Sequence, residues 1–304
     1  MCNTPRPRLT GLLLVLAVYV LLLNGCSKKD ESTSPPPPQK VVIQNAGSDT
    51  MVNLAQAWAE AYAKVSPNVS IEVSGGGSGT GIAALINGTV DIANCSRKMK
   101  PIEIERTKKN TGKEPQELTV GYDALAVYVH KGNPLSEISI EQLANIYGEE
   151  GTITKWSQLE IQYAACANDE IIRISRQSNS GTYAYFREAL LGKTSDFKLG
   201  SRDLHGSKDV VELVSSTPCA IGYSGMGYAT KHVKMLKVSK NTGGPSASPS
   251  VENTLSGDYP IARPLYIYSL GTPNGEIKKY LDWVLSETGQ SIVSENGYVL
   301  LPKE

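Results

Sequence analysis

Short apolar runs that alternate with amphipathic segments are the feature that most constrains the fold of this chain. Val41–Ile43 and Val69–Val73 are predicted strands, and Met51–Lys64 between them carries apolar residues at spacings of three and four, which predicts a helix. Further strands are expected at Val90–Ala93, Leu125–Val129, Ile171–Ser175, Ala220–Tyr223 and Pro264–Tyr268, and further helices at Ile140–Tyr147, Thr182–Leu190 and Glu276–Ser286. This alternation favours an α/β fold with mainly parallel sheets flanked by helices.

Three polar loops stand directly before predicted helices, and each combines glycine with hydroxyl side chains. They are Gly47–Thr50, Gly77–Gly81 and Asn179–Thr182, and Arg176 lies four residues before Ser180. A helix N-terminus offers unpaired N–H groups and the positive end of the dipole, so such loops suit an oxyanion. A guanidinium nearby adds a bidentate donor. The alternatives are ordinary helix caps and, for Arg176, a structural ion pair.

Composition excludes several other functions. The chain has 30 basic and 30 acidic residues among 304, so its formal charge is zero and nucleic-acid binding is not expected. No two of its five cysteines lie within four residues of each other, and its three histidines are scattered, so neither a metal nor a cofactor is expected. We find no phosphate loop and no nucleophile elbow, so a hydrolase, the candidate from another class, lacks its machinery and a non-enzymatic protein is predicted.

The N-terminal region predicts export and lipid anchoring. The apolar run Gly11–Leu23 has 13 residues, fewer than the roughly 20 that span a membrane. It follows a basic start and is itself followed by Asn-Gly-Cys, which resembles a bacterial lipobox with Cys26 as the lipidated residue. We therefore expect a signal peptide over residues 1–25 and an extended tether over residues 26–40 with four consecutive prolines. The alternative is a plain membrane anchor.

Six stretches resemble the PstS-type phosphate-binding proteins of phosphate ABC transporters, in the type II periplasmic-binding-protein superfamily. They are AGSDTMVNLAQAWAEAY (46–62), GGGSGTGIAALINGTVDIANCSRKMK (75–100), DALAVYVHKGNPLSEISIEQLANIYGEEGTITKWSQL (123–159), RQSNSGTYAYF (176–186), IGYSGMGYA (221–229) and ARPLYIYS (262–269). The resemblance implies two lobes with the anion between them. Lobe one would hold residues 41–121 plus 231–304, and lobe two residues 122–230, with two chain crossings as the hinge.

The resemblance also implies the phosphate-binding residues. They would be Ser48, Asp49, Thr50, Ser78 and Ser96 from lobe one, and Arg176, Ser180, Gly181 and Thr182 from lobe two. The chain departs from the family pattern at Arg97, where an Asp usually accepts the proton of hydrogenphosphate, and at Ser178, where an acid usually partners the clamp arginine. Asp49 or Asp123 would replace the missing acceptor, and Asp123 is favoured. The alternatives are a helix cap for Asp49 and a hinge salt bridge for Asp123.

The function that follows is capture of inorganic phosphate by a monomeric, lipid-anchored, extracytoplasmic protein, which passes the ion to the permease subunits of an ABC transporter. The alternatives are another tetrahedral oxyanion, such as sulfate or molybdate, and a phosphate-sensing or adhesion lipoprotein. Export permits a disulfide, and Cys166 with Cys219 is the expected pair because both fall in lobe two, although the sequence leaves the pairing open.

Overall fold

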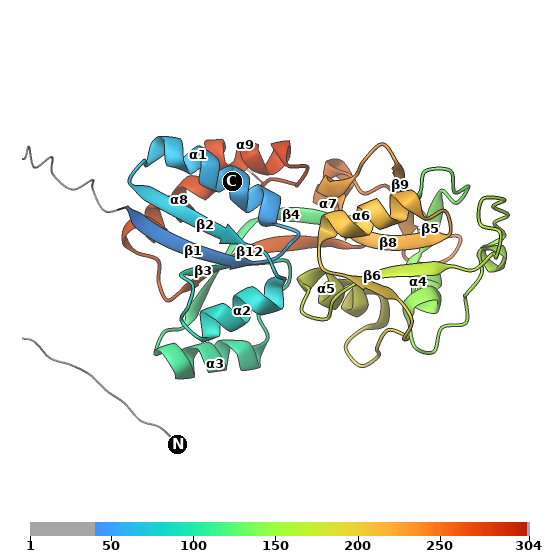
Figure 1. The fold of residues 1–304 in the computed structure, drawn as a ribbon, viewed down its shortest axis with the longest axis horizontal. Coiled ribbons are helices and arrows are strands. Elements are labelled where there is room, and N and C mark those ends of the chain that lie inside the picture. The colour runs from blue at the N-terminus through green and yellow to red at the C-terminus, as the bar shows by residue number, and fades with distance from the viewer. Residues whose placement is uncertain (1–39, 303–304) are drawn as a thin grey trace, which may run out of the picture. The chain divides into compact units, whose positions relative to one another are not determined.

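The structure is a computed structural model of the chain, and it describes residues 40–302 (Figure 1). The predicted signal peptide, Cys26 and the tether before Lys40 lie outside the described residues. The strands are β1 (Val41–Gly47), β2 (Val69–Ser74), β3 (Ile92–Cys95), β4 (Pro115–His130), β5 (Glu137–Ser139), β6 (Ile172–Arg176), β7 (Arg202–Leu204), β8 (Ala220–Gly225), β9 (Val233–Met235), β10 (Lys237–Ser239), β11 (Ser246–Ala247) and β12 (Ala262–Leu270). The helices are α1 (Val52–Val65), α2 (Ser78–Ile86), α3 (Pro101–Thr111), α4 (Ile140–Tyr147), α5 (Gly181–Leu191), α6 (Ser207–Ser216), α7 (Val251–Ser256), α8 (Gly275–Leu285) and α9 (Glu287–Glu295), with 3-10 turns at Trp156–Leu159 and Met226–Tyr228. None of the described helices is long and apolar enough to cross a membrane.

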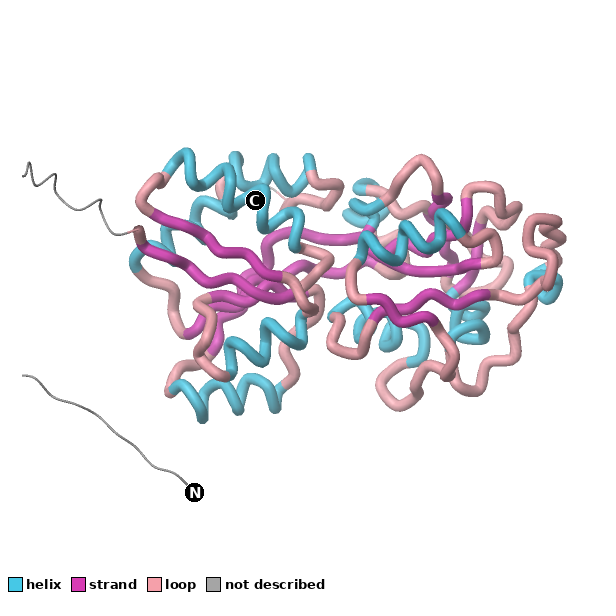
Figure 2. Tube along the Cα trace, viewed as in Figure 1, coloured by secondary structure: helices cyan, strands magenta, loops and turns pink. Residues whose placement is uncertain are grey.

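In the described residues 40–302 the main sheet has nine strands, and helices cover both of its faces (Figure 2), whereas β11, β10 and β5 form a separate three-stranded sheet. The order of the main sheet is β2-β1-β3-β12-β4-β8-β6-β7, with β9 paired to β4. The pairs β1–β2, β1–β3, β6–β7 and β6–β8 are parallel, whereas β12 and β4 run antiparallel to their neighbours. The predicted α/β class is confirmed, but the sheet is mixed rather than mainly parallel, because β12 and β4 are inserted antiparallel between the parallel strands of the two ends.

Two lobes share this sheet because β4 belongs to both. Its first part, Pro115–Ala124, pairs with β12, and its second part, Leu125–Val129, pairs with β8. The first lobe buries apolar side chains of α1, α8 and α9 against the sheet, and the second buries those of α4, α5 and α6. The chain therefore passes between the lobes along β4 near Asp123 and returns along β12 near Arg263, two residues that are partners in the strand register.

The strand pairing favours a return crossing further along the chain than the sequence led us to expect. Residues after 230 were expected in the first lobe, but β9 pairs with β4 and β10 pairs with β5. Leu236 and Ile261 are buried in the core of the second lobe. We therefore propose the boundary near Ala262, because these apolar side chains find their partners in the second lobe.

A disulfide joins Cys166 and Cys219 in the second lobe, as expected. Their Cα atoms are 5.0 Å apart and the residues are 53 positions apart in sequence. Cys95 is buried and is the free cysteine of the described residues. The bond links the loop after the Trp156–Leu159 turn to the start of β8, so it restrains a long segment of the unfolded chain.

Replacing both Cys166 and Cys219 by serine should lower the free energy of unfolding by about 2–4 kcal/mol, because the unfolded chain regains the entropy of an open loop. Urea unfolding of the variant and of the oxidised wild type measures this difference. Wild type unfolded in reductant is the matched control and should approach the variant. Equal urea midpoints for variant and oxidised wild type would contradict the prediction.

Candidate anion-binding site

The predicted site residues meet where strands of both lobes end. Ser48–Thr50 follows β1, Ser96 follows β3 and Arg176 ends β6. The carboxyl ends of parallel strands, followed by helix N-termini, are where open α/β sheets hold their ligands. The structure brings together all ten residues named from the sequence or the resemblance, and all of them are buried.

Serine hydroxyls form the first-lobe part of the cluster. The Ser48 hydroxyl donates to Ser96 Oγ at 3.0 Å, and the oxygens of Ser78 and Ser96 lie 3.3 Å apart. The Ser96 backbone N–H donates to Ser78 Oγ at 3.0 Å. Three segments that are separate in sequence therefore place their hydroxyls within one hydrogen-bonded group.

The second lobe contacts this group directly. The hydroxyl oxygens of Thr50 and Thr182 lie 2.8 Å apart, and the Gly79 N–H donates to the Asn179 carbonyl at 2.9 Å. A Cβ atom on Gly181 would lie 2.3 Å from Ser78 Oγ, so only glycine permits this close approach. The start of α5 thus lies against the loops that precede α1 and α2.

The three helices that begin at the cluster differ in whether a side chain caps their N-termini. No side chain caps α1 or α2. The alternative of an ordinary helix cap is therefore wrong for Ser48–Thr50, because those side chains contact Ser96, Arg176 and Thr182 instead. At α5 the cap is present, and Ser180 Oγ accepts from the N–H groups of Thr182 and Tyr183. The α1 and α2 N-termini therefore face the cluster without a side-chain cap.

Arg176 is fully buried and lies at the centre of a set of acceptors. Its Nη2 donates to Asp49 Oδ2 at 3.1 Å, and its Nη1 donates to Ser207 Oγ at 2.9 Å. Nε and Nη2 both donate to the His205 carbonyl, at 3.1 and 2.6 Å. Burial lowers the pKa of this guanidinium, and the Asp49 carboxylate acts in the opposite direction. Because Asp49 is on the first lobe and Arg176 on the second, their ion pair joins the lobes across the site.

Asp49 also receives a hydrogen bond from the Gly-rich loop. Its Oδ1 accepts from the Gly76 N–H at 2.8 Å and lies 3.8 Å from Nε2 of the half-exposed His205. The acid that the family pattern places two residues after the clamp arginine is thus supplied here by a residue from the opposite lobe.

Asp123 forms a buried salt bridge with Arg263, an arginine that we did not identify from the sequence. The Arg263 Nε and Nη2 donate to Asp123 Oδ2 at 3.1 and 2.8 Å, and the Met226 N–H is 3.3 Å from Oδ1. Burial raises the pKa of Asp123, and Arg263 acts in the opposite direction. This is the hinge salt bridge weighed above as the alternative for Asp123. The signal in the sequence was an arginine at the second position of the otherwise largely apolar stretch ARPLYIYS.

Arg97 points away from the hydroxyl cluster. Its Nη1 and Nη2 donate to the two carboxylate oxygens of Glu103, each at 2.8 Å, beside the N-terminus of α3. The substitution of arginine for the usual aspartate at this position therefore removes an acceptor without adding a guanidinium to the cluster.

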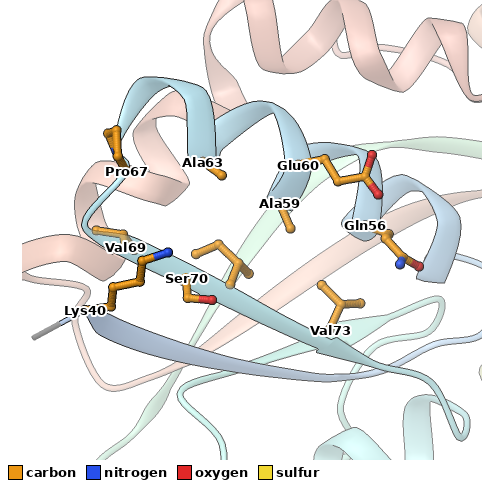
Figure 3. Close-up of a pocket in the computed structure, with 10 residues that line it drawn as sticks. Lys40, Gln56, Ala59, Glu60, Ala63, Pro67, Val69, Ser70 and Val73 are labelled. Carbon is orange, nitrogen blue, oxygen red and sulfur yellow. The ribbon is translucent and has the colours of Figure 1, made fainter. Parts of the chain in front are cut away.

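A cavity of about 410 Å³ lies elsewhere, between α1 and the edge strand β2 (Figure 3). Its lining includes Gln56, Ala63 and Val73, and none of the predicted site residues. Within residues 40–302 no group of three or more His, Cys, Asp or Glu side chains could hold a metal ion. The hydroxyl and guanidinium cluster is therefore the site with the clearest chemistry, and its donors suit a small tetrahedral oxyanion.

Comparisons with known proteins agree with this chemistry. Residues 33–288 match the family described as PBP superfamily domain. The chain is 37% identical over 270 residues to the phosphate-binding protein PstS of Pseudomonas aeruginosa, which covers 86% of this chain and 83% of that protein. A crystal structure with bound phosphate from Clostridium perfringens, described as a phosphate ABC transporter substrate-binding protein, has a TM-score of 0.75 at 28% identity and covers 86% of this chain and all of that one. An ABC-type phosphate transport receptor from Vibrio cholerae has a TM-score of 0.67 at 26% identity, over 85% of this chain and all of that one. These matches confirm the resemblance stated from the sequence, and the chain belongs to the PBP superfamily and, within it, to the family of the PstS phosphate-binding proteins.

Proposed function

We propose that this protein captures inorganic phosphate outside the cytoplasm and passes it to the permease of an ABC transporter. The observation that carries the proposal is the convergence of hydroxyls and the Arg176 guanidinium, from both lobes, in one buried cluster. The names of the relatives, a phosphate-binding protein and a substrate-binding protein with bound phosphate, support the choice of ion.

The binding residues would be those that the cluster contains. They are Ser48, Asp49, Thr50, Ser78, Ser96, Ser180, Gly181, Thr182 and Arg176, with Asp123 acting through Arg263 rather than on the ion. Opening about β4 and β12 would admit phosphate, and closure would surround it with donors in a dry site, where charge-assisted hydrogen bonds are strong. The ion would take the place of Asp49 on Arg176, whose other acceptors all lie in its own lobe.

Binding alone accounts for this arrangement, and we propose no catalytic step. His205 is the histidine beside the cluster, and its side chain bonds to Gln177 rather than to a serine hydroxyl. Without a base on a hydroxyl, the cluster has donors for an oxyanion but no activated nucleophile.

Replacing Arg176 by alanine should weaken phosphate binding at least tenfold, because a charge-assisted hydrogen bond contributes about 1.5–3 kcal/mol. Isothermal titration with phosphate measures the affinity, and thermal unfolding without phosphate checks the fold. Arg173→Ala is the matched control, since Arg173 lies on the same strand and donates to the Leu199 carbonyl outside the site. Unchanged affinity in a folded Arg176→Ala variant would sink the proposed site.

Selectivity for phosphate over sulfate should depend on Asp49. Wild type should prefer phosphate by about a hundredfold or more, about 2.7 kcal/mol, because only hydrogenphosphate carries a proton for a buried acceptor. Asp49→Asn should shrink this ratio, since an amide can donate to sulfate. Asp123→Asn should weaken both ions together and keep the ratio, because Asp123 acts on donors that both ions share.

Competition titrations with both anions measure these ratios. If wild type bound sulfate as tightly as phosphate, the protein would be a general oxyanion binder. If Asp123→Asn alone collapsed the ratio, the acceptor would be Asp123, as the sequence first suggested.

Lipid anchoring on Cys26 is part of the proposal and has its own test. Cys26→Ala should move the protein from the membrane fraction to the soluble fraction, because the lipid chains are lost. Cys2→Ala is the matched control, since Cys2 lies in the predicted signal peptide, and this variant protein should remain in the membrane fraction. Tight membrane association of Cys26→Ala would show that the apolar run itself is the anchor.

A further inference from the structure

Arg263 and Asp123 occupy the two points where the chain passes between the lobes. They are partners in the register of β12 and β4, and their side chains are 1% and 0% exposed. Strand β4 continues from one lobe into the other, and β12 starts at their junction, so this pair lies on the hinge itself. Within that pair, both Nε and Nη2 of Arg263 contact the same carboxylate oxygen, which fixes the orientation of the guanidinium plane.

The rest of this guanidinium points into the anion site. Its Nη2 lies 3.0 Å from Thr182 Oγ1 and 3.4 Å from Thr50 Oγ1, and its Nη1 donates to the Ser96 carbonyl at 3.1 Å. Thr50 and Ser96 belong to the first lobe and Thr182 to the second. One buried side chain on the hinge therefore contacts proposed phosphate-binding segments of both lobes at the same time.

These contacts determine what the threonine hydroxyls can do. A hydroxyl has one donor and two acceptor lone pairs. When an oxygen accepts a hydrogen bond from the guanidinium, its own proton must be directed to another acceptor. The two threonine oxygens are 2.8 Å apart, so one hydroxyl donates to the other until a better acceptor is present. An oxyanion in the cluster is that acceptor, and Arg263 would leave both protons available to it.

We propose that Arg263 is a positioning residue for anion capture: held by Asp123 on the hinge, it orients the hydroxyls of Thr50 and Thr182 as donors when the lobes close. This inference rests on the proposed phosphate-binding function. The pair is locally neutral, so its role is to aim donors rather than to supply net charge. A purely structural ion pair between two strands would need none of the threonine contacts.

The test is a double-mutant cycle on the full-length chain, read by titration with inorganic phosphate. Arg263→Lys should weaken binding at least tenfold, because a single ammonium cannot reproduce the fork that holds Asp123 and Thr182 together. In the Thr182→Val background the factor by which Arg263→Lys weakens phosphate binding should be at least threefold smaller, since the hydroxyl that Arg263 orients is already absent. Arg187→Lys, at an arginine of α5 that pairs with Asp196, is the matched control and should leave affinity unchanged.

Equal losses from Arg263→Lys in both backgrounds, or no loss in either, would overturn the inference. If the Arg263→Lys variant fails to fold, Asp123→Asn replaces it in the cycle. Asparagine has nearly the same shape as aspartate, and it leaves Arg263 in position but without its charged partner. Its loss of affinity should likewise shrink in the Thr182→Val background, and additive losses would count against the inference. If the wild-type protein failed to bind phosphate, the proposed function would be rejected. If it binds phosphate but the losses of affinity in the double-mutant cycle are additive, only the positioning role of Arg263 is rejected.

Discussion

The arrangement of the whole site depends on β4 and β12 running side by side from one lobe to the other. Their pairing places Asp123 against Arg263 at the junction, and the sheet continues on each side of it. Because the neighbouring strands β3 and β8 are held by these two, the ends of β1, β3 and β6 face a common space. A buried ion pair is costly to desolvate unless its geometry is good and its remaining groups are bonded. Here Met226, Ser96 and the two threonines provide those bonds.

This constraint explains why the loops at the site carry small polar residues. The loops that start α1, α2 and α5 approach each other so closely that Gly181 has no room for a Cβ atom. Gly77 has a φ of 93°, a conformation that glycine adopts readily, and it precedes the first residue of α2. Larger side chains would separate the lobes, whereas serine and threonine hydroxyls satisfy one another until an anion is bound. The same residues therefore serve close packing and, in the proposed site, would also serve ligand recognition.

Local sequence patterns predicted much of this structure, and the features that they missed have two kinds of cause. The apolar residues at helical spacing in Met51–Lys64 correctly predicted α1. The hydroxyl-bearing loops could be identified because glycine and serine directly before a helix are a local signal. Helix α3 was missed because Thr107 is its one buried residue, so it has no apolar stripe. Arg263 was missed because its role depends on Asp123, 140 positions away. The boundary that we propose near Ala262 depends in the same way on distant strands, because β9 pairs with β4 and β10 pairs with β5.

The charges of the cluster would let the proposed site both hold an ion and release it. Arg176 and Arg263 are each paired with a carboxylate, so the four groups are neutral together. A neutral cluster avoids the cost of a buried, unpaired guanidinium when no ion is bound. In the proposed site, phosphate would then compete with Asp49 for Arg176, and it would do so only while the hydroxyls and helix N-termini of both lobes supply further donors. If the lobes separated, the ion would lose the donors of one lobe. Arg176 would pair with Asp49 again when the lobes closed without an ion. The affinity of the proposed site for phosphate would therefore depend on closure of the lobes. Arg263 lies on the hinge and contacts hydroxyls of both lobes, so it would couple closure to recognition of the ion.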